Sequence, residues 1–215
     1  MKTANYFKSI IAVMLLFWTM LALADDDMES AIAELQHGWA RVLYQTPRNQ
    51  KEVTYQELVA KAHQATINFQ GHVEPMVWEA IILSSYAGFI NGLGSLRNLQ
   101  TAKELLLSAE QIDPTAMDGT IPMVLGVIHY KAPHWPVSFG ESGKARAYLE
   151  TALQYDPDGI DPNFYYGEFL LKQGDHATAR IYLEKALVAA PRAGREDADS
   201  GRTAEISQML QDIKP

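Results

Sequence analysis

The sequence predicts an all-α protein, an α-solenoid of about four helical hairpins followed by a C-terminal capping helix. A pattern A-x3-L-x2-A-x4-P occurs three times, with copies that begin at Ala102, Ala145 and Ala179. The second copy follows the first after 43 residues, and the third follows after a further 34. Alanines let a second helix approach its partner closely, the leucine fills the contact, and the proline ends the helix. We therefore expect Ala145, Ala152, Ala179 and Ala186 to be buried where helices meet.

Each repeated second helix is preceded by a segment with the features of a first helix. Gly167 and Gly126 supply the small residue expected in the last two first helices, and the segment from Trp78 to Ile82 matches the one before. A weaker hairpin is predicted around Ala40. The expected hairpins are 28–70, 75–114, 118–157 and 161–191. After a polar stretch, apolar residues at helical spacing predict a solvent-facing capping helix over 202–213, with Ile206, Met209, Leu210 and Ile213.

A 34-residue period with alanine, leucine and proline at these places resembles the tetratricopeptide repeat. Residues 75–191 are similar to three such repeats, and 28–70 to a degenerate fourth. Two motifs, WEAIILSSYA over 78–87 and APHWPVSFG over 132–140, resemble those of secreted bacterial tetratricopeptide proteins. A weaker likeness runs to the periplasmic T component of TRAP-type transporters, which has such repeats and a loop containing S-F-G. The resemblance implies a helical scaffold that binds a partner or ligand, and it transfers no catalytic residue.

The first 24 residues have the features of a signal peptide. Lys2 and Lys8 precede an apolar stretch from Ile10 to Leu23, and small residues at 22 and 24 fit cleavage before Asp25. The stretch is shorter than the roughly 20 residues that cross a bilayer core. We therefore expect a mature soluble protein over 25–215, periplasmic or secreted, with no stable membrane span. An uncleaved N-terminal anchor is the alternative.

Composition and motifs argue against several classes of function. Apolar residues make up 47% of the chain, as in ordinary folded proteins, and the formal charge of −8 without a basic run disfavours nucleic acid. The absence of cysteine excludes disulfides, thiolate metal sites and a thiol nucleophile. No motif of a nucleotide loop, nucleophile elbow or metalloprotease occurs, and His129, His134 and Glu141 could hold a metal only if their loop folded back. We expect no enzyme activity, cofactor or metal.

Two segments lengthen the second and third hairpins relative to the plain repeat. The first, 91–96, is rich in glycine. It is either a loop that presents backbone N–H groups to an anion or a long turn between helices. We favour the turn, with Ser95 capping the next helix. The second, 133–143, contains Trp135 and Phe139, which either pack onto the array or contact a partner. Both segments leave the same edge of the stack, where insertions commonly form a binding face.

Candidate binding residues follow from the concave face of such an array, which the first helices line. The equivalent anchor positions in these helices are predicted to be Ala40, Ile82, Gly126 and Gly167. Four residues further on lies a tyrosine row, consisting of Tyr44, Tyr86, Tyr130 and Leu171. Tyrosine suits binding because it offers a broad apolar surface and a hydroxyl, although these side chains could instead pack between repeats. The other expected groove residues are Arg41, Glu79, Lys131, Glu168 and Lys172.

These observations predict an exported scaffold that binds a protein or peptide partner in its concave groove. The alternative, which the likeness to the T component implies, is a transport accessory protein that encloses a small-molecule ligand. An oligomer that retains a small molecule would favour the alternative, and a strict monomer without one would favour the scaffold.

Overall fold

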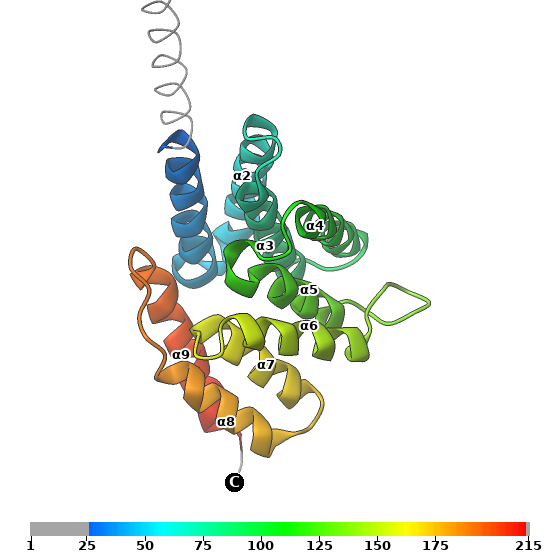
Figure 1. The fold of residues 1–215 in the computed structure, drawn as a ribbon, viewed down its shortest axis with the longest axis vertical. Coiled ribbons are helices and arrows are strands. Elements are labelled where there is room, and N and C mark those ends of the chain that lie inside the picture. Colours follow the sequence, from blue (N-terminus) through cyan, green and yellow to red (C-terminus); the bar gives the residue numbers. More distant parts are fainter. Residues whose placement is uncertain (1–25, 214–215) are drawn as a thin grey trace, which may run out of the picture.

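A computed structural model describes residues 26–213, whose regular elements are helices, as predicted. The first hairpin consists of a helix over 26–40, its π-helical continuation η1 (Arg41–Gln45), and α2 (Arg48–Asn68). The later hairpins are α3 (Val73–Phe89) with α4 (Leu93–Ile112), α5 (Thr120–Lys131) with α6 (Ser142–Tyr155), and α7 (Ile160–Lys172) with α8 (His176–Leu187). A 3-10 turn, η2 (Ala116–Gly119), leads into α5, and α9 (Glu196–Asp212) ends the described chain. Figure 1 shows the hairpins stacked one after another.

The repeated alanines and leucines form the contacts between helices. Ala145, Ala152, Ala179 and Ala186 are fully buried, which confirms the prediction made from their spacing. The leucine between each pair is fully buried as well, because it fills the space that the small alanines leave between the two helices of a hairpin. The sequence pattern therefore specifies the packing within each hairpin.

The first lengthened segment is not a long loop. Helix α3 ends at Phe89 and α4 begins at Leu93, so most of the glycine-rich segment is the first turn of α4. Gly92 makes the turn with a φ of 74°, a conformation that favours glycine. Ser95 does not cap α4 as we expected, because its hydroxyl donates to the Ala87 carbonyl at 2.8 Å. The additional residues lengthen both helices.

The second lengthened segment is a loop over 132–141 that projects from the array (Figure 1). Two backbone hydrogen bonds close its base, from Gly140 to the Pro133 carbonyl at 2.9 Å and from Glu141 to the His129 carbonyl at 3.0 Å. A Cβ at Gly140 would lie 2.1 Å from the Ala132 carbonyl oxygen. Only glycine therefore permits the two ends of the loop to approach each other this closely.

Helix α9 differs from the solvent-facing cap that we predicted. It begins at Glu196, six residues before the expected start, and it packs against α8. Its N-terminal half also contacts η1 of the first hairpin, so α9 runs along one side of the array between the first hairpin and the last (Figure 1). The buried Ile206 and Ile213 cover the apolar flank of the last hairpin, as a cap requires.

The expected signal peptide over 1–24 and the cleavage before Asp25 lie outside the described residues. Within 26–213, no helix combines the length and the hydropathy needed to cross a membrane.

Candidate functional site: the concave groove

The first helices of the four hairpins line one groove on the inner face of the array. On each helix the groove residues recur at spacings of three and four, which places them on one stripe of its surface. Part of α9 and the segment before it close one side of the groove. The lining residues include Gln36, Trp39 and Leu43 of the first hairpin, Ile81, Ser84 and Gly88 of α3, Val124, Val127 and Lys131 of α5, and Tyr165 and Glu168 of α7.

Two glycines mark equivalent positions in α5 and α7, as predicted. A Cβ at Gly126 would lie 2.6 Å from the Leu149 side chain, and one at Gly167 would lie 2.8 Å from the Leu183 side chain. Glycine is therefore needed at both positions for the second helix of the hairpin to approach. The residue one place further on, Val127 in α5, faces the groove.

In the first two hairpins the equivalent positions differ from those predicted. Gly38 makes the corresponding contact, because its Cβ would lie 2.7 Å from Leu58, so the anchor precedes Ala40 by two residues. In α3, Ile82 belongs to the core shared with the first hairpin, whereas Leu83 belongs to the core shared with α4. The anchor of α3 is therefore Leu83. Sequence spacing could have shown this, since 43 residues separate Leu83 from its counterpart in α5, as they separate the second-helix alanines.

The corrected alignment changes which side chains face the groove. The row one place past the anchors lines the groove and reads Trp39, Ser84, Val127 and Glu168. The row four places past the anchors lies inside the array and reads Val42, Ala87, Tyr130 and Leu171. Trp39 and Ser84 are thus groove residues that the sequence analysis missed.

Two members of the predicted tyrosine row lie between repeats. Tyr86 is 9% exposed, and its ring stacks on Tyr55 of α2 with centroids 5.3 Å apart. Tyr130 is 3% exposed, and its hydroxyl donates to Glu168 of the next hairpin at 2.5 Å. Burial raises the pKa of Tyr130 well above its usual range, and the adjacent Glu168 raises it further. Both side chains occupy the position that packing between neighbouring repeats requires.

Three expected groove residues form a charged cluster at one end of the groove. Lys131 and Glu168 form an ion pair at 3.1 Å, and both side chains are partly exposed. The ammonium group of Lys172 donates to the Tyr130 carbonyl of the neighbouring hairpin. Because partly exposed ion pairs contribute little to stability, the Lys131 ammonium group can leave this pair at small cost, whereas Glu168 is also held by the buried Tyr130 hydroxyl.

Arg41 and Glu79 lie away from this groove. Arg41 is exposed and lines a separate cavity between the first helix and α2. Glu79 is 4% exposed and binds His63 of α2 at 2.9 Å. The structure therefore does not bring these two residues together with the rest of the predicted set.

A buried ionic network attaches α9 to the groove. Arg202, which is 3% exposed, donates to Asp161 at 2.9 Å and to the Tyr165 hydroxyl at 2.9 Å. Arg192 donates to the other oxygen of Asp161 at 2.6 Å and to Asp199. Burial by itself would raise the pKa of Asp161, but Arg202 and Arg192 hold it below its usual value. The ion pair between Arg202 and Asp161 is costly to break, because loss of one partner would leave the other charge buried.

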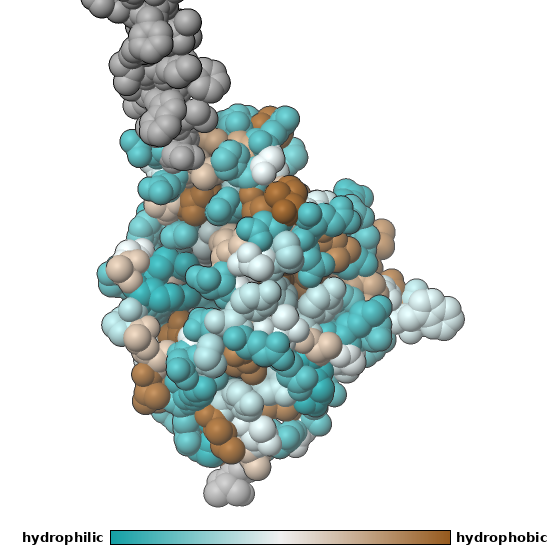
Figure 2. Space-filling model, in the orientation of Figure 1, coloured by the Kyte–Doolittle hydropathy of each residue, from teal (hydrophilic) through white to brown (hydrophobic). Residues whose placement is uncertain are grey.

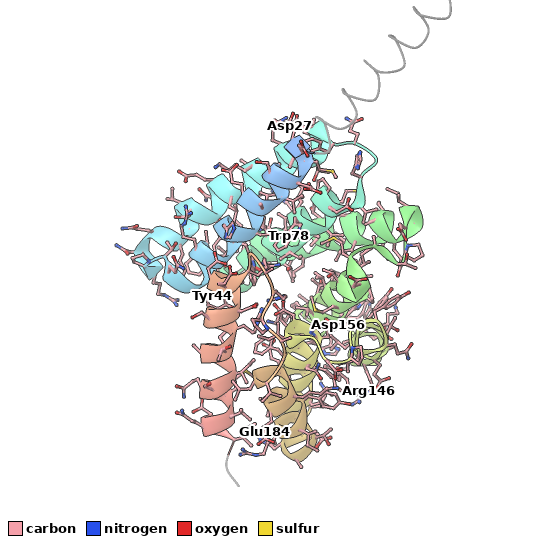
Figure 3. The ribbon with its side chains drawn as sticks, turned by 60° about the vertical axis from the view of Figure 1, so that its left-hand side comes forward. Asp27, Tyr44, Trp78, Arg146, Asp156 and Glu184 are labelled. Atoms are coloured by element: carbon pink, nitrogen blue, oxygen red, sulfur yellow. The ribbon has the colours of Figure 1, made fainter. Side chains whose placement is uncertain are left out.

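Tyr44 is the member of the predicted row that contacts α9. Its hydroxyl donates to Glu205 at 3.0 Å, and Figure 3 shows Tyr44 lying against α9 at the end of the N-terminal helix. Gly201 permits this contact, since a Cβ there would lie 2.2 Å from the tyrosine ring. The contact joins the two ends of the described chain.

The two aromatic side chains of the projecting loop have different surroundings. Trp135 is 85% exposed, whereas Phe139 packs back on the array. The Phe139 ring lies edge-on to His129 with centroids 5.4 Å apart, and the Lys103 ammonium group lies 4.1 Å from its centre. Burial lowers the pKa of His129, and nearby lysines lower it further. Figure 2 shows this loop as a projection from a largely polar face with scattered apolar patches.

Between residues 26 and 213, no group of three or more histidines and acidic residues is placed to hold a metal ion. His129 instead stacks on Tyr148, with ring centroids 5.8 Å apart. The histidine therefore takes part in packing at the base of the loop.

Comparisons with known proteins agree with this geometry. The family model described as tetratricopeptide repeat matches residues 138–196. Among solved structures, a thermophilic TPR protein of Thermus thermophilus, TTC0263, is 17% identical with a TM-score of 0.54, over 90% of this chain and 95% of that chain. PilF of Pseudomonas aeruginosa is 14% identical with a TM-score of 0.38, over 88% and 93%. No curated protein matches the sequence. Residues 138–196 thus match the tetratricopeptide repeat in sequence, and the described chain has the all-α solenoid fold of tetratricopeptide proteins.

Proposed function

We propose that the protein is an exported scaffold that binds an extended segment of a protein partner in the open part of its concave groove. One observation carries the proposal: the first helices of all four hairpins contribute side chains to a single cavity of about 280 Å³. Tetratricopeptide arrays use such concave surfaces for interaction with other proteins, which supports this assignment.

The groove favours a partner segment that is polar at one end and apolar at the other. At the polar end, Lys131, Glu168 and Glu205 lie beside Arg202. Past Gly88 and Lys131 the groove continues into a second hollow of about 530 Å³, which both lengthened segments line. The most exposed apolar side chains of this hollow are Leu93, 81% exposed, and Val137, 65% exposed.

Gly88 offers a direct test, because it lines both hollows and a Cβ there would meet no atom within 4 Å. A photo-crosslinking amino acid at position 88 should capture the partner in the native host. The same amino acid at Ala147, which is exposed on α6, is the matched control. Mass spectrometry of the crosslinked peptide then identifies the partner segment.

A blocking variant completes the test. Gly88→Phe fills the groove without meeting the backbone and should weaken binding of the identified segment by at least about tenfold while leaving the fold intact. A segment that crosslinks equally from positions 88 and 147, or that binds Gly88→Phe as well as the native chain, would place binding outside the groove.

Export to the periplasm or the medium is part of the proposal, and the pattern of residues 1–24 supports it. Intact mass of the protein from its native host should correspond to a chain that begins at Asp25. Recovery of residues 1–24 in a membrane fraction would instead indicate an N-terminal anchor.

A further inference from the structure

A small cavity forms one end of the groove, between the N-terminal helix, α3, α5 and the segment before α9, next to the open part proposed for the partner. Its volume is about 120 Å³. This is somewhat less than the roughly 150 Å³ of a dry protein cavity that accommodates benzene, but the cavity is open on the side of Met117 and Arg195, so a compact body fits with its polar end toward that opening. Figure 3 shows Trp78 at this junction. Most of the wall is apolar and consists of Trp39, Trp78, Ile81, Met117, Met123 and Val124.

Two hydrogen-bond donors on the wall of this cavity have no acceptor within residues 26–213. They are the indole N–H of Trp78 and the Nε–H of Arg195. Trp78 is 3% exposed, and a buried donor without an acceptor is unfavourable. The guanidinium carbon of Arg195 lies 5.1 Å from the centre of a Trp78 ring, so both residues belong to the same part of the wall. A ligand with acceptor oxygens here would satisfy both donors.

Arg195 also has a charge that no carboxylate of the described chain neutralises at ion-pair distance. The one acidic residue on the described part of this wall is Asp161, and its two oxygens already accept from Arg202 and Arg192. Asp199 likewise accepts from Arg192. Burial lowers the pKa of Arg195 and the like charge of Arg192 lowers it further, while Asp161, Asp199 and Asp197 act in the opposite direction. An anion in direct contact with Arg195 would offset the cost of burying its charge.

We propose that this cavity binds a compact organic carboxylate, whose apolar body fills the cavity while its oxygens accept from Arg195 and Trp78. Inorganic phosphate would leave the apolar wall uncovered, and a neutral ring would leave Arg195 without a counter-charge. Met117, Thr120 and Arg195 line both this cavity and an open hollow of about 860 Å³, which provides a route from solvent. The site adjoins the open part of the groove that is proposed for the partner, and the two share Ser84, Val127, Tyr165 and Arg202.

Calorimetric titration of the full chain with benzoate and with benzamide, an uncharged analogue of the same shape, tests the proposal. Benzoate should bind one site at least about tenfold more tightly than benzamide. Arg195→Gln removes the charge and should abolish this preference, whereas Arg97→Gln, at an exposed position on α4, should retain it. Trp78→Phe removes the indole donor and should weaken benzoate binding about threefold or more.

Equal affinity for the two probes, or unchanged benzoate binding by Arg195→Gln, would overturn the proposal. So would the failure of both benzoate and hexanoate to bind with a Kd below about 1 mM. Gly88→Phe separates this site from the groove, because it should block partner binding and leave benzoate binding unchanged. Unfolding curves for each variant confirm that the fold is retained.

Discussion

Replacing Gly201 with alanine should weaken the contact between α9 and the first hairpin. The added Cβ would lie 2.2 Å from Cγ of Tyr44, so either the ring or the helix must move. Movement of the ring also disturbs its hydrogen bond to Glu205. Overpacking of this kind costs about 1–3 kcal/mol. For a chain of this length the unfolding temperature should fall by roughly 2–4 °C per kcal/mol.

Gly88→Ala is the matched control. Both glycines lie within helices, but a Cβ at position 88 would meet no atom within 4 Å. Alanine is favoured over glycine in a helix interior by about 0.5–1 kcal/mol, and Gly88 is the second-last residue of α3, so this variant should be at least as stable as the native protein. The same chemical change is thus expected to lower the free energy of unfolding at position 201 and not at position 88.

Thermal unfolding followed by circular dichroism measures both variants, and hydrogen exchange over 196–212 localises the effect to α9. In a Tyr44→Ala background the clash is absent, so Gly201→Ala should become neutral or stabilising. Stabilisation of the native protein by Gly201→Ala, or destabilisation that persists without the Tyr44 ring, would refute the reasoning.

Three further predictions concern the network and the core. Arg202→Met leaves Asp161 buried with one fewer cation and should lower the free energy of unfolding by about 3–5 kcal/mol. The exposed control Arg97→Met should change it by less than about 0.5 kcal/mol. Denaturant titration measures both variants. Because the pKa of Asp161 is held below its unfolded value of about 3.9, its contribution to stability is present above that pH and is lost as pH falls through the lowered pKa. Acid unfolding of Asp161→Asn should therefore depend less steeply on pH than that of the native chain. Ala179→Leu should destabilise by about 1–3 kcal/mol, and Ala177→Leu, exposed on the same helix, should not; equal thermal unfolding of the two would contradict the assigned packing.

Residue spacing predicted the hairpins because each depends on local, repeated contacts. An alanine or glycine at a helix crossing is needed wherever two backbones approach, so it recurs in the sequence and can be counted. The same reasoning failed in α3, where Leu83 occupies the position that glycine has in α5 and α7. Without a small residue to mark the crossing, Ile82 and Leu83 are equally apolar, and only the spacing to the next repeat distinguishes them.

The path of α9 could not be predicted from any local pattern. Its apolar residues indicated a helix that covers α8, and that part is present in the structure. Its other contacts depend on Gly201 and Arg202, whose partners lie in the first and last hairpins. A single sequence does not indicate which distant residues a glycine or a buried arginine will meet, so the closure of the groove on one side was missed.

This closure changes how the array should respond to a partner. In an open solenoid each repeat contacts only its neighbours, and the free energy of folding is nearly a sum of local terms. Here the hydrogen bond between Tyr44 and Glu205 joins residues 161 positions apart, so α9 forms one side of the groove and links the first hairpin to the last. A groove whose width is fixed in this way loses less conformational freedom when a partner binds. Gly201→Ala should therefore weaken binding to the groove even though position 201 does not line it, and Gly88→Ala should not alter the groove width.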